Sequence, residues 1–129
     1  MAEVEKAILS RLSLATAGLA SAGSIWAVLA PQDQAKPYIV FEVLDEIPTN
    51  VMSKETAPTE CFFTARIYAD LFSEIVSITD DVRSSFERFT GTADGIVVQD
   101  VFYEGRADNY DDRDREYERE LTFRIWFEE

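Results

Sequence analysis

The chain has 129 residues, enough for one domain that buries roughly two-thirds of the surface exposed by its unfolded form. Its 25 acidic and 12 basic residues give a net charge of −13, and it contains no histidine. This balance disfavours phosphate binding, which needs clustered Lys or Arg, and the commonest general base and metal ligand is missing. A hydrophobic content of 47% indicates a folding sequence rather than a disordered one.

The single cysteine, Cys61, cannot form an internal disulfide, which is typical of a protein made in a reducing cytoplasm. No apolar run approaches the roughly 20 residues of a membrane span. Residues 1–6 also lack the basic region and apolar stretch of a signal peptide. We therefore expect a protein without a membrane-associated segment.

The first half of the chain predicts one helix and two strands. Apolar residues at helical spacing predict an amphipathic helix over residues 3–17. Residues 24–28 favour a short strand at an edge, and two prolines in 30–37 then force an extended arm. Residues 38–44 are apolar except for Glu42, which is typical of a well-covered strand.

The polar segment 45–59 contains two prolines and no apolar period. A loop of this length in a compact domain is usually functional or mobile, and we expect a mobile loop here.

Residues 61–70 predict the central strand, because both of its faces carry apolar side chains. From Leu71 to Phe89 apolar residues recur at steps of three or four, which predicts a long helix following that strand almost without a linker. Residues 90–95 then predict a helix exit and a turn.

The chain closes on two further predicted strands, residues 96–103 and 117–127. The last strand alternates cleanly between apolar and polar residues, with Arg119 and Trp126 as the exceptions. The acidic segment 104–116 between these strands is interpreted as the tip of a long hairpin.

These elements predict a single α+β domain over residues 1–129, in the order α-β-β-β-α-β-β. We expect a mostly antiparallel, or a mixed, sheet of four to five strands with two helices packed on one face.

The sequence contains no catalytic or cofactor-binding motif that we recognise. Cys61 has no activating neighbour in the sequence and is interpreted as a buried structural thiol. The acidic run 108–114 resembles a calcium loop only in part, since the alternation of ligands fails, the glycine is missing and arginines intrude. A solvated hairpin tip explains it better, so we expect no catalytic residue, no cofactor and no metal site.

Some strand faces carry more apolar residues than a single layer of two helices requires. Phe62 and Tyr68 share one face of the central strand, and Trp126 interrupts the polar face of the last strand. This surplus favours self-association.

Four segments together carry a resemblance to a known family. They read V-L-A-P-Q at 28–32, K-P-Y-I-V-F at 36–41, R-I-Y-A at 66–69 before a helix, and L-T-F-R-I-W-F at 121–127. In order and spacing the chain resembles the tail-completion or tail-terminator family of long-tailed bacteriophages and related gene transfer particles. The acidic tip is longer and more acidic than that family leads us to expect.

The resemblance implies a structural virion protein without enzymatic activity, made in the cytoplasm of the bacterial host. It implies a ring, commonly a hexamer, at the head-proximal end of the tail tube, where the ring ends tube polymerisation and provides the surface for head docking. The implied partners are further copies of the chain, the tail tube protein and a head-side connector or stopper protein. DNA is expected to pass through the channel without specific binding.

Two groups of residues are candidates for these contacts. Acidic side chains of the hairpin tip are expected to line the channel or face a partner: Asp108, Asp111, Asp112, Asp114 and Glu116. Residues of the arm, the loop and the last strand are expected to contact a subunit or the tube: Pro31, Gln32, Lys36, Pro37, Ile47, Val51, Met52, Lys54 and Trp126.

Other readings stay open at this point. One is another component of the neck, such as a head-side stopper. A different class is an acidic inhibitor, either a nuclease immunity protein or a DNA mimic whose carboxylates occupy a basic active site. An enzyme would require a metal-dependent activity that is lost on replacing Asp111 or Asp112.

Overall fold

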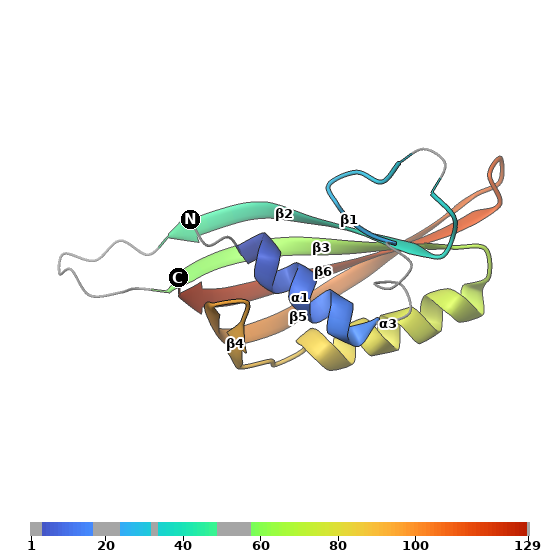
Figure 1. Ribbon diagram of the computed structural model, residues 1–129. Helices are drawn as coiled ribbons and strands as arrows, with labels where there is room; N and C mark the ends of the chain where they lie inside the picture. The colour runs from blue at the N-terminus through green and yellow to red at the C-terminus, as the bar shows by residue number, and fades with distance from the viewer. Residues whose placement is uncertain (1–3, 17–23, 32–33, 49–57, 129) are drawn as a thin grey trace.

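The computed structural model describes residues 4–16, 24–31, 34–48 and 58–128 (Figure 1). These residues form two helices, α1 (Val4–Ala15) and α3 (Phe72–Phe86). The strands are β1 (Ile25–Ala27), β2 (Tyr38–Pro48), β3 (Thr59–Ala69), β4 (Gly91–Ala93), β5 (Ile96–Asp111) and β6 (Glu116–Glu128). None of the described helices is long and apolar enough to cross a membrane.

The strands form one six-stranded sheet in the order β1-β2-β3-β6-β5-β4. β1 pairs with β2 in parallel and every other pair is antiparallel, so the sheet is mixed. The α+β class and the central place of β3 are confirmed, but the expected four to five strands are too few. Gly91–Ala93, predicted as a turn, forms β4 by pairing with the start of β5.

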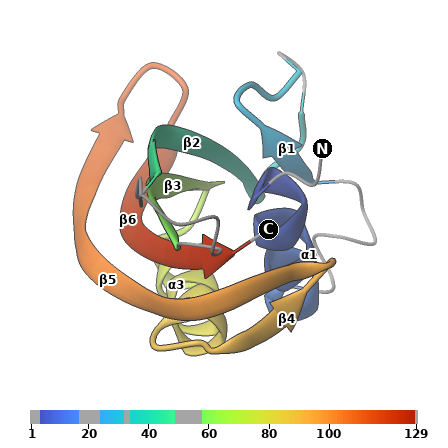
Figure 2. The ribbon, with the colours of Figure 1, turned by 90° about the vertical axis from the view of Figure 1, so that its left-hand side faces the viewer.

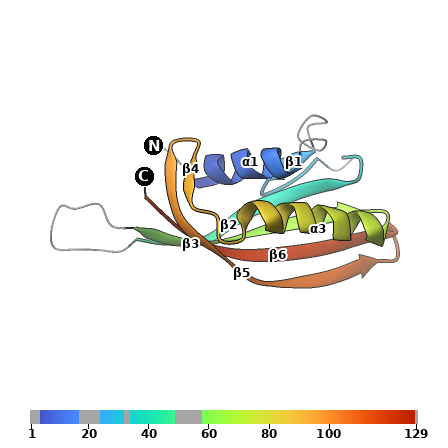
Figure 3. The same ribbon diagram turned by 90° about the horizontal axis from the view of Figure 1, so that it is seen from below.

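Both helices lie on one side of the sheet, as predicted. Figure 2 shows the sheet curling around them, and Figure 3 shows α1 and α3 side by side on its concave face. Phe63 of β3, Phe86 of α3 and Phe123 of β6 meet there, with ring centroids 5.2–5.5 Å apart. Burial of such aromatic side chains is the largest local contribution to the core.

The strands of both hairpins run further than their apolar pattern indicates. β2 continues to Pro48, so residues 45–48 belong to the strand and not to a loop. Residues 49–57 lie outside the described residues. β5 continues to Asp111 and β6 begins at Glu116, which leaves only residues 112–115 as the turn of the predicted tip 104–116. Backbone pairing extends these ribbons beyond the helices, where no core imposes an alternation of side chains.

Candidate assembly surfaces

The acidic turn closes the long β5–β6 hairpin at one end of the molecule (Figure 1). Its first residue pair joins Asp111 to Glu116. Asp111 Oδ1 accepts the backbone N–H of Arg113 at 2.9 Å and of Asp114 at 3.4 Å, a common way for aspartate to stabilise a turn. Asp111, Asp112 and Asp114 are exposed, and their charges point into solvent.

Three carboxylates of this turn come close together. One oxygen each of Asp111, Asp114 and Glu116 lies within 4.8 Å of the others. Burial, and then the charges of Asp114 and Asp111, raise the pKa of Glu116 against the opposing influence of Lys36. Since one oxygen of Asp111 already accepts the turn amides, the geometry agrees with the predicted solvated hairpin tip.

The turn is tied to the arm that precedes β2. Tyr38 donates its hydroxyl to Glu116 Oε1 at 3.3 Å. Lys36 Nζ donates to the carbonyl oxygen of Asp114 and to Asp70 Oδ1, both at 3.3 Å. These contacts border an open depression of about 380 Å³ lined by Gln34, Lys36, Tyr38, Asp114 and Glu116. The predicted arm and the predicted tip therefore form one continuous surface.

Asp108 occupies a different environment from the other tip acids. Its carboxylate accepts two hydrogen bonds from Arg119, at 2.7 Å from Nε and 3.1 Å from Nη2. The side chain of Arg119 is only 2% exposed, and its Nη1 donates to the hydroxyl of Thr79 in α3. Arg119 lowers the pKa of Asp108, chiefly through these hydrogen bonds, which favour the charged carboxylate. Asp108 thus anchors the hairpin to the helix layer.

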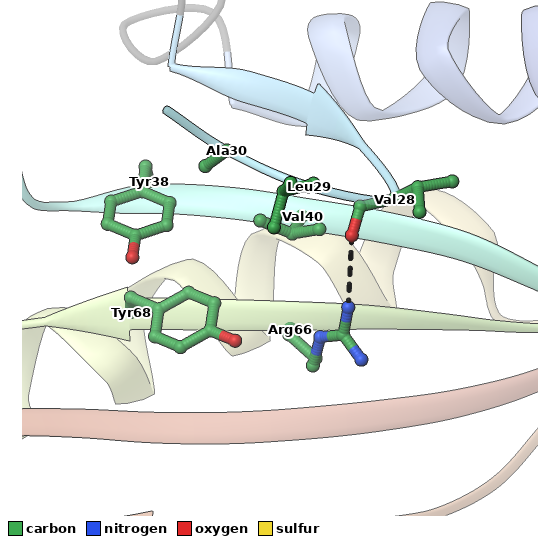
Figure 4. A pocket seen from close by; sticks show the side chains of 7 residues that line it. All are labelled: Val28, Leu29, Ala30, Tyr38, Val40, Arg66 and Tyr68. Atoms are coloured by element: carbon green, nitrogen blue, oxygen red, sulfur yellow. Dashed lines mark hydrogen bonds between the residues drawn. The ribbon is translucent and has the colours of Figure 1, made fainter. Parts of the chain in front are cut away.

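The arm and the outer, convex face of the sheet enclose a small pocket (Figure 4). Tyr38 and Tyr68 stack with their ring centroids 4.7 Å apart, and Arg66 Nη2 donates to the carbonyl oxygen of Val28 at 3.4 Å. The pocket is about 130 Å³ and is lined by Val28, Leu29, Ala30, Tyr38, Val40, Arg66 and Tyr68. Leu29 is 79% exposed and extends the apolar surface beside it.

Tyr38 and Tyr68 are held as neutral hydroxyls. Burial is the main cause that raises the pKa of each to about 12, and the nearby carboxylates of Glu116 and Glu118 add to it. Each hydroxyl donates to the glutamate in front of it. The pair therefore acts as a packing platform with two hydrogen-bond donors, and not as an acid or base at neutral pH.

The outer face lacks a covering helix among the described residues (Figure 3). Phe62, Phe102 and Trp126 are half-buried there, and Arg124 packs over Phe102 with its guanidinium 5.2 Å from the ring centroid. Trp126 therefore sits where the sequence placed it, on the face away from the helices. Arg119, the other exception in β6, is on the core face.

The remaining predicted contact residues divide into three groups. Pro31 is exposed, and Lys36 and Pro37 are half-buried in the arm. Ile47 is 52% exposed on β2. Gln32, Val51, Met52 and Lys54 lie outside the described residues. The arm and β2 thus supply exposed positions, while Trp126 contributes from the sheet face.

Sequence reasoning missed two exposed residues that border these surfaces. Leu44 of β2 is 52% exposed, and Arg88, which follows α3, has a side chain that is 62% exposed. Leu44 was predicted to end a covered strand, whereas it sits at a β-bulge between Val43 and Asp45. No pattern in the sequence marks that bulge.

The fold is shared with a solved structure of low sequence identity. A chain of the virion of a native gene transfer agent (GTA) particle matches with a TM-score of 0.68 at 12% identity, covering 95% of this chain and 92% of that chain. Comparison with curated proteins gives no match.

Residues 6–128 match the family described as tail completion protein gp17. This match spans nearly the whole chain and confirms the resemblance found in the sequence. The chain belongs to the tail completion protein gp17 family.

Proposed function

We propose that this tail completion protein forms a ring, a hexamer, at the head-proximal end of the tail tube. The ring ends tube polymerisation and presents the surface on which the head docks. The protein works by shape and carries out no reaction. The observation that carries the proposal is the match to a tail completion family over residues 6–128, joined to exposed surfaces on separate parts of the fold.

Three kinds of contact are required of such a ring, and the fold offers a surface for each. The partners are a neighbouring copy, the tail tube protein and a head-side connector or stopper protein. The arm around Lys36 and the edge of β2 around Ile47 project at the side of the sheet, and the uncovered face carries Trp126. Exposed apolar and half-buried aromatic side chains are the usual anchors of protein interfaces.

The acidic turn has a separate role in this proposal. Asp111, Asp112 and Asp114 are exposed at the far end of the hairpin, where their charges repel phosphate. Asp108 and Glu116 lie nearby on the two strands of the hairpin, where Asp108 accepts a hydrogen bond from Arg119 and Glu116 accepts one from Tyr38. These side chains line the channel, and DNA passes them without specific binding.

The experiment compares particles made with and without this protein. Tails are purified from cells in which the gene is deleted and imaged by negative-stain electron microscopy. We expect overlong tubes, or tubes of normal length without heads, and restoration by the intact chain. Tails of normal length joined to heads in the deletion strain would overturn the proposal.

A control variant separates loss of function from loss of folding. Asp80→Ala removes an exposed charge from α3, away from the sheet edges and the hairpin turn. Complementation with this variant should restore normal tails as well as the intact chain does.

A further inference from the structure

The two edges of the sheet are each covered only in part, and at opposite ends. β1 pairs with Ile39–Phe41, the start of β2, and β4 pairs with Ile96–Val98, the start of β5. The N–H of Val28 donates to the carbonyl oxygen of Phe41, and no described strand pairs with the outer side of β2 beyond that residue. The backbone of Arg88 donates to Val101 of β5, and no described strand pairs with the outer side of β5 from Phe102 onward.

The pairing register shows that these two partly covered edges have complementary outlines. Residues that pair with one another across successive strands form a row perpendicular to the strands. The row that contains Ile39 and Ile67 ends at Asp108 of β5 and includes β1 but not β4. The row through Pro48 reaches Val98 and includes β4 but not β1. Both rows therefore contain five strands. A copy shifted sideways along the sheet would place its β1 against the free end of β5.

Strand direction is compatible with this arrangement. β2 and β5 run in opposite directions because three antiparallel pairings separate them. β1 runs parallel to β2, so a neighbour's β1 would lie antiparallel to β5. In the middle rows both edges carry bulges, at Val43/Asp45 and Tyr103/Gly105. Bulges interrupt a regular ladder, so contact there is made through side chains.

The side chains of the middle rows are complementary in charge. Asp45 is exposed on β2 and lies in the row that ends at Phe102 of β5. Arg88 lies beside β5 close to the end of this row, because its guanidinium is 2.8 Å from Asp100 and 4.6 Å from the ring centroid of Phe102. Asp45 forms no ion pair within the described residues. Leu44 and Ile47, each 52% exposed, flank it.

We propose that a second copy of this chain docks head to tail along the sheet edge, with its Arg88 facing Asp45 and its Phe102 edge meeting Leu44 and Ile47. This contact joins two different surfaces, so each copy keeps one free edge for a further copy. Repetition closes into a ring if the rotation between copies permits it. The inference rests on the proposed function and names the surfaces that its subunit contact uses.

Thiol cross-linking of the purified full chain tests this contact. The variant Asp45→Cys with Arg88→Cys is concentrated, treated with a short bis-maleimide and analysed by denaturing electrophoresis. Cys61 is fully buried and does not compete in the folded chain. We expect a ladder of covalent trimers and larger species, since each copy presents one new thiol to each neighbour. The single variants Asp45→Cys and Arg88→Cys should give no species beyond the dimer.

An off-register pair provides the matched control. Asp45→Cys with Arg113→Cys places the second thiol on the exposed hairpin turn, away from the proposed contact. A ladder from this control as strong as that of the proposed pair, or no ladder from the proposed pair, would overturn the inference. Overlong tubes in the deletion strain without a ladder would leave the proposed function standing and refute only this edge. A ladder from the proposed pair, together with normal tails in the deletion strain, would support this edge contact and refute the proposed function.

Discussion

Arg119 shows how a single buried charge holds the long hairpin in place. Its guanidinium donates to both oxygens of Asp108 and to Thr79, and it lies 5.3 Å from the ring centroid of Phe72. A buried cation without its partner costs far more than the pair contributes, because the desolvation of the charge is then uncompensated. Asp108 is therefore more important for folding than its position near an exposed acidic turn indicates.

Replacing Asp108 by alanine should lower the free energy of unfolding by about 1–3 kcal/mol, the cost of leaving a buried polar group without its partner. The lower end is expected because the side chain of Asp108 is 43% exposed. Urea unfolding measures the difference. Asp112→Ala, a substitution on the exposed turn, serves as the control and should change stability little. Equal stabilities for the two variants would contradict the prediction.

The contribution of Asp108 also depends on pH. Arg119 holds the pKa of Asp108 below its ordinary value of 3.8 in the folded chain. A carboxylate whose folded-state pKa is lowered stabilises the fold above its unfolded pKa, and this stabilisation is lost as the pH falls through the folded value. The stability difference between the intact chain and Asp108→Ala should thus be full at pH 6 and shrink below pH 3.8. Urea unfolding of both proteins at pH 6 and at a pH below 3.8 measures this difference in stability.

At the scale of elements, the sequence predicts those strands and helices whose apolar faces pack together in the core. The apolar residues of β3, α3 and β6 alternate or recur because one face of each is buried, so their type and order are recovered from the sequence. The distal halves of β2 and β5 have solvent on both faces, and segments such as Glu104–Asp111 carry no period. Arg119 was noted as an exception to the alternation of β6, but its partner was not identified, because register across a hairpin depends on a bulge near Gly105.

The segment from Ser24 to Gln34, which carries β1, is held to β2 by a small polar network as well as by the packing of Ile25 against the core. Gln34 Oε1 accepts the indole N–H of Trp26 at 2.8 Å, and its Nε2 donates to Ser24 Oγ at 3.3 Å. The backbone N–H of Ile39 donates to the carbonyl oxygen of Ser24, and that of Val28 to the carbonyl oxygen of Phe41. Because β1 is only three residues long and lies at the edge of the sheet, local opening of this element is expected to precede global unfolding.

Replacing Gln34 by alanine should release the arm without unfolding the sheet. We expect amide hydrogen exchange of Val28 and Ile39 to become about five-fold faster, since loss of roughly 1 kcal/mol of hydrogen bonding changes the opening equilibrium by about that factor. The amides of Phe63 and Phe123 in the central strands should exchange as in the intact chain. Uniform acceleration across the sheet, or none at Val28, would show that the network does not hold the arm.

For the whole molecule, the distribution of surfaces matters more than any single site. The chain carries a net charge of −13, and an acidic turn closes the β5–β6 hairpin. Exposed apolar residues are spread over both helices and β5, and Leu29, Leu44 and Ile47 lie on the β1–β2 side of the sheet. Exposed apolar residues such as Leu29, Leu44 and Ile47 would have no role in a protein that made no contacts with other chains. The end of β2 that carries Leu44 and Ile47 lies at the opposite end of the sheet from the acidic turn (Figure 1). In the proposed ring, this end of β2 would contact a neighbouring copy and the acidic turn would face the channel.

If the acidic turn lines the channel, reversing its charge should retard DNA on its way out. Asp112→Lys with Asp114→Lys would attract phosphate where the intact chain repels it, so we expect particles carrying this variant to eject DNA several-fold more slowly. The slowing should diminish as salt rises, because the screening length falls to about 10 Å at 0.1 M ionic strength. Asp80→Lys with Asp81→Lys makes the same charge change on exposed positions of α3 and should leave ejection unchanged. Time-resolved measurement of DNA release from purified particles compares the two. Similar ejection rates for both variants would place the turn away from the path of the DNA.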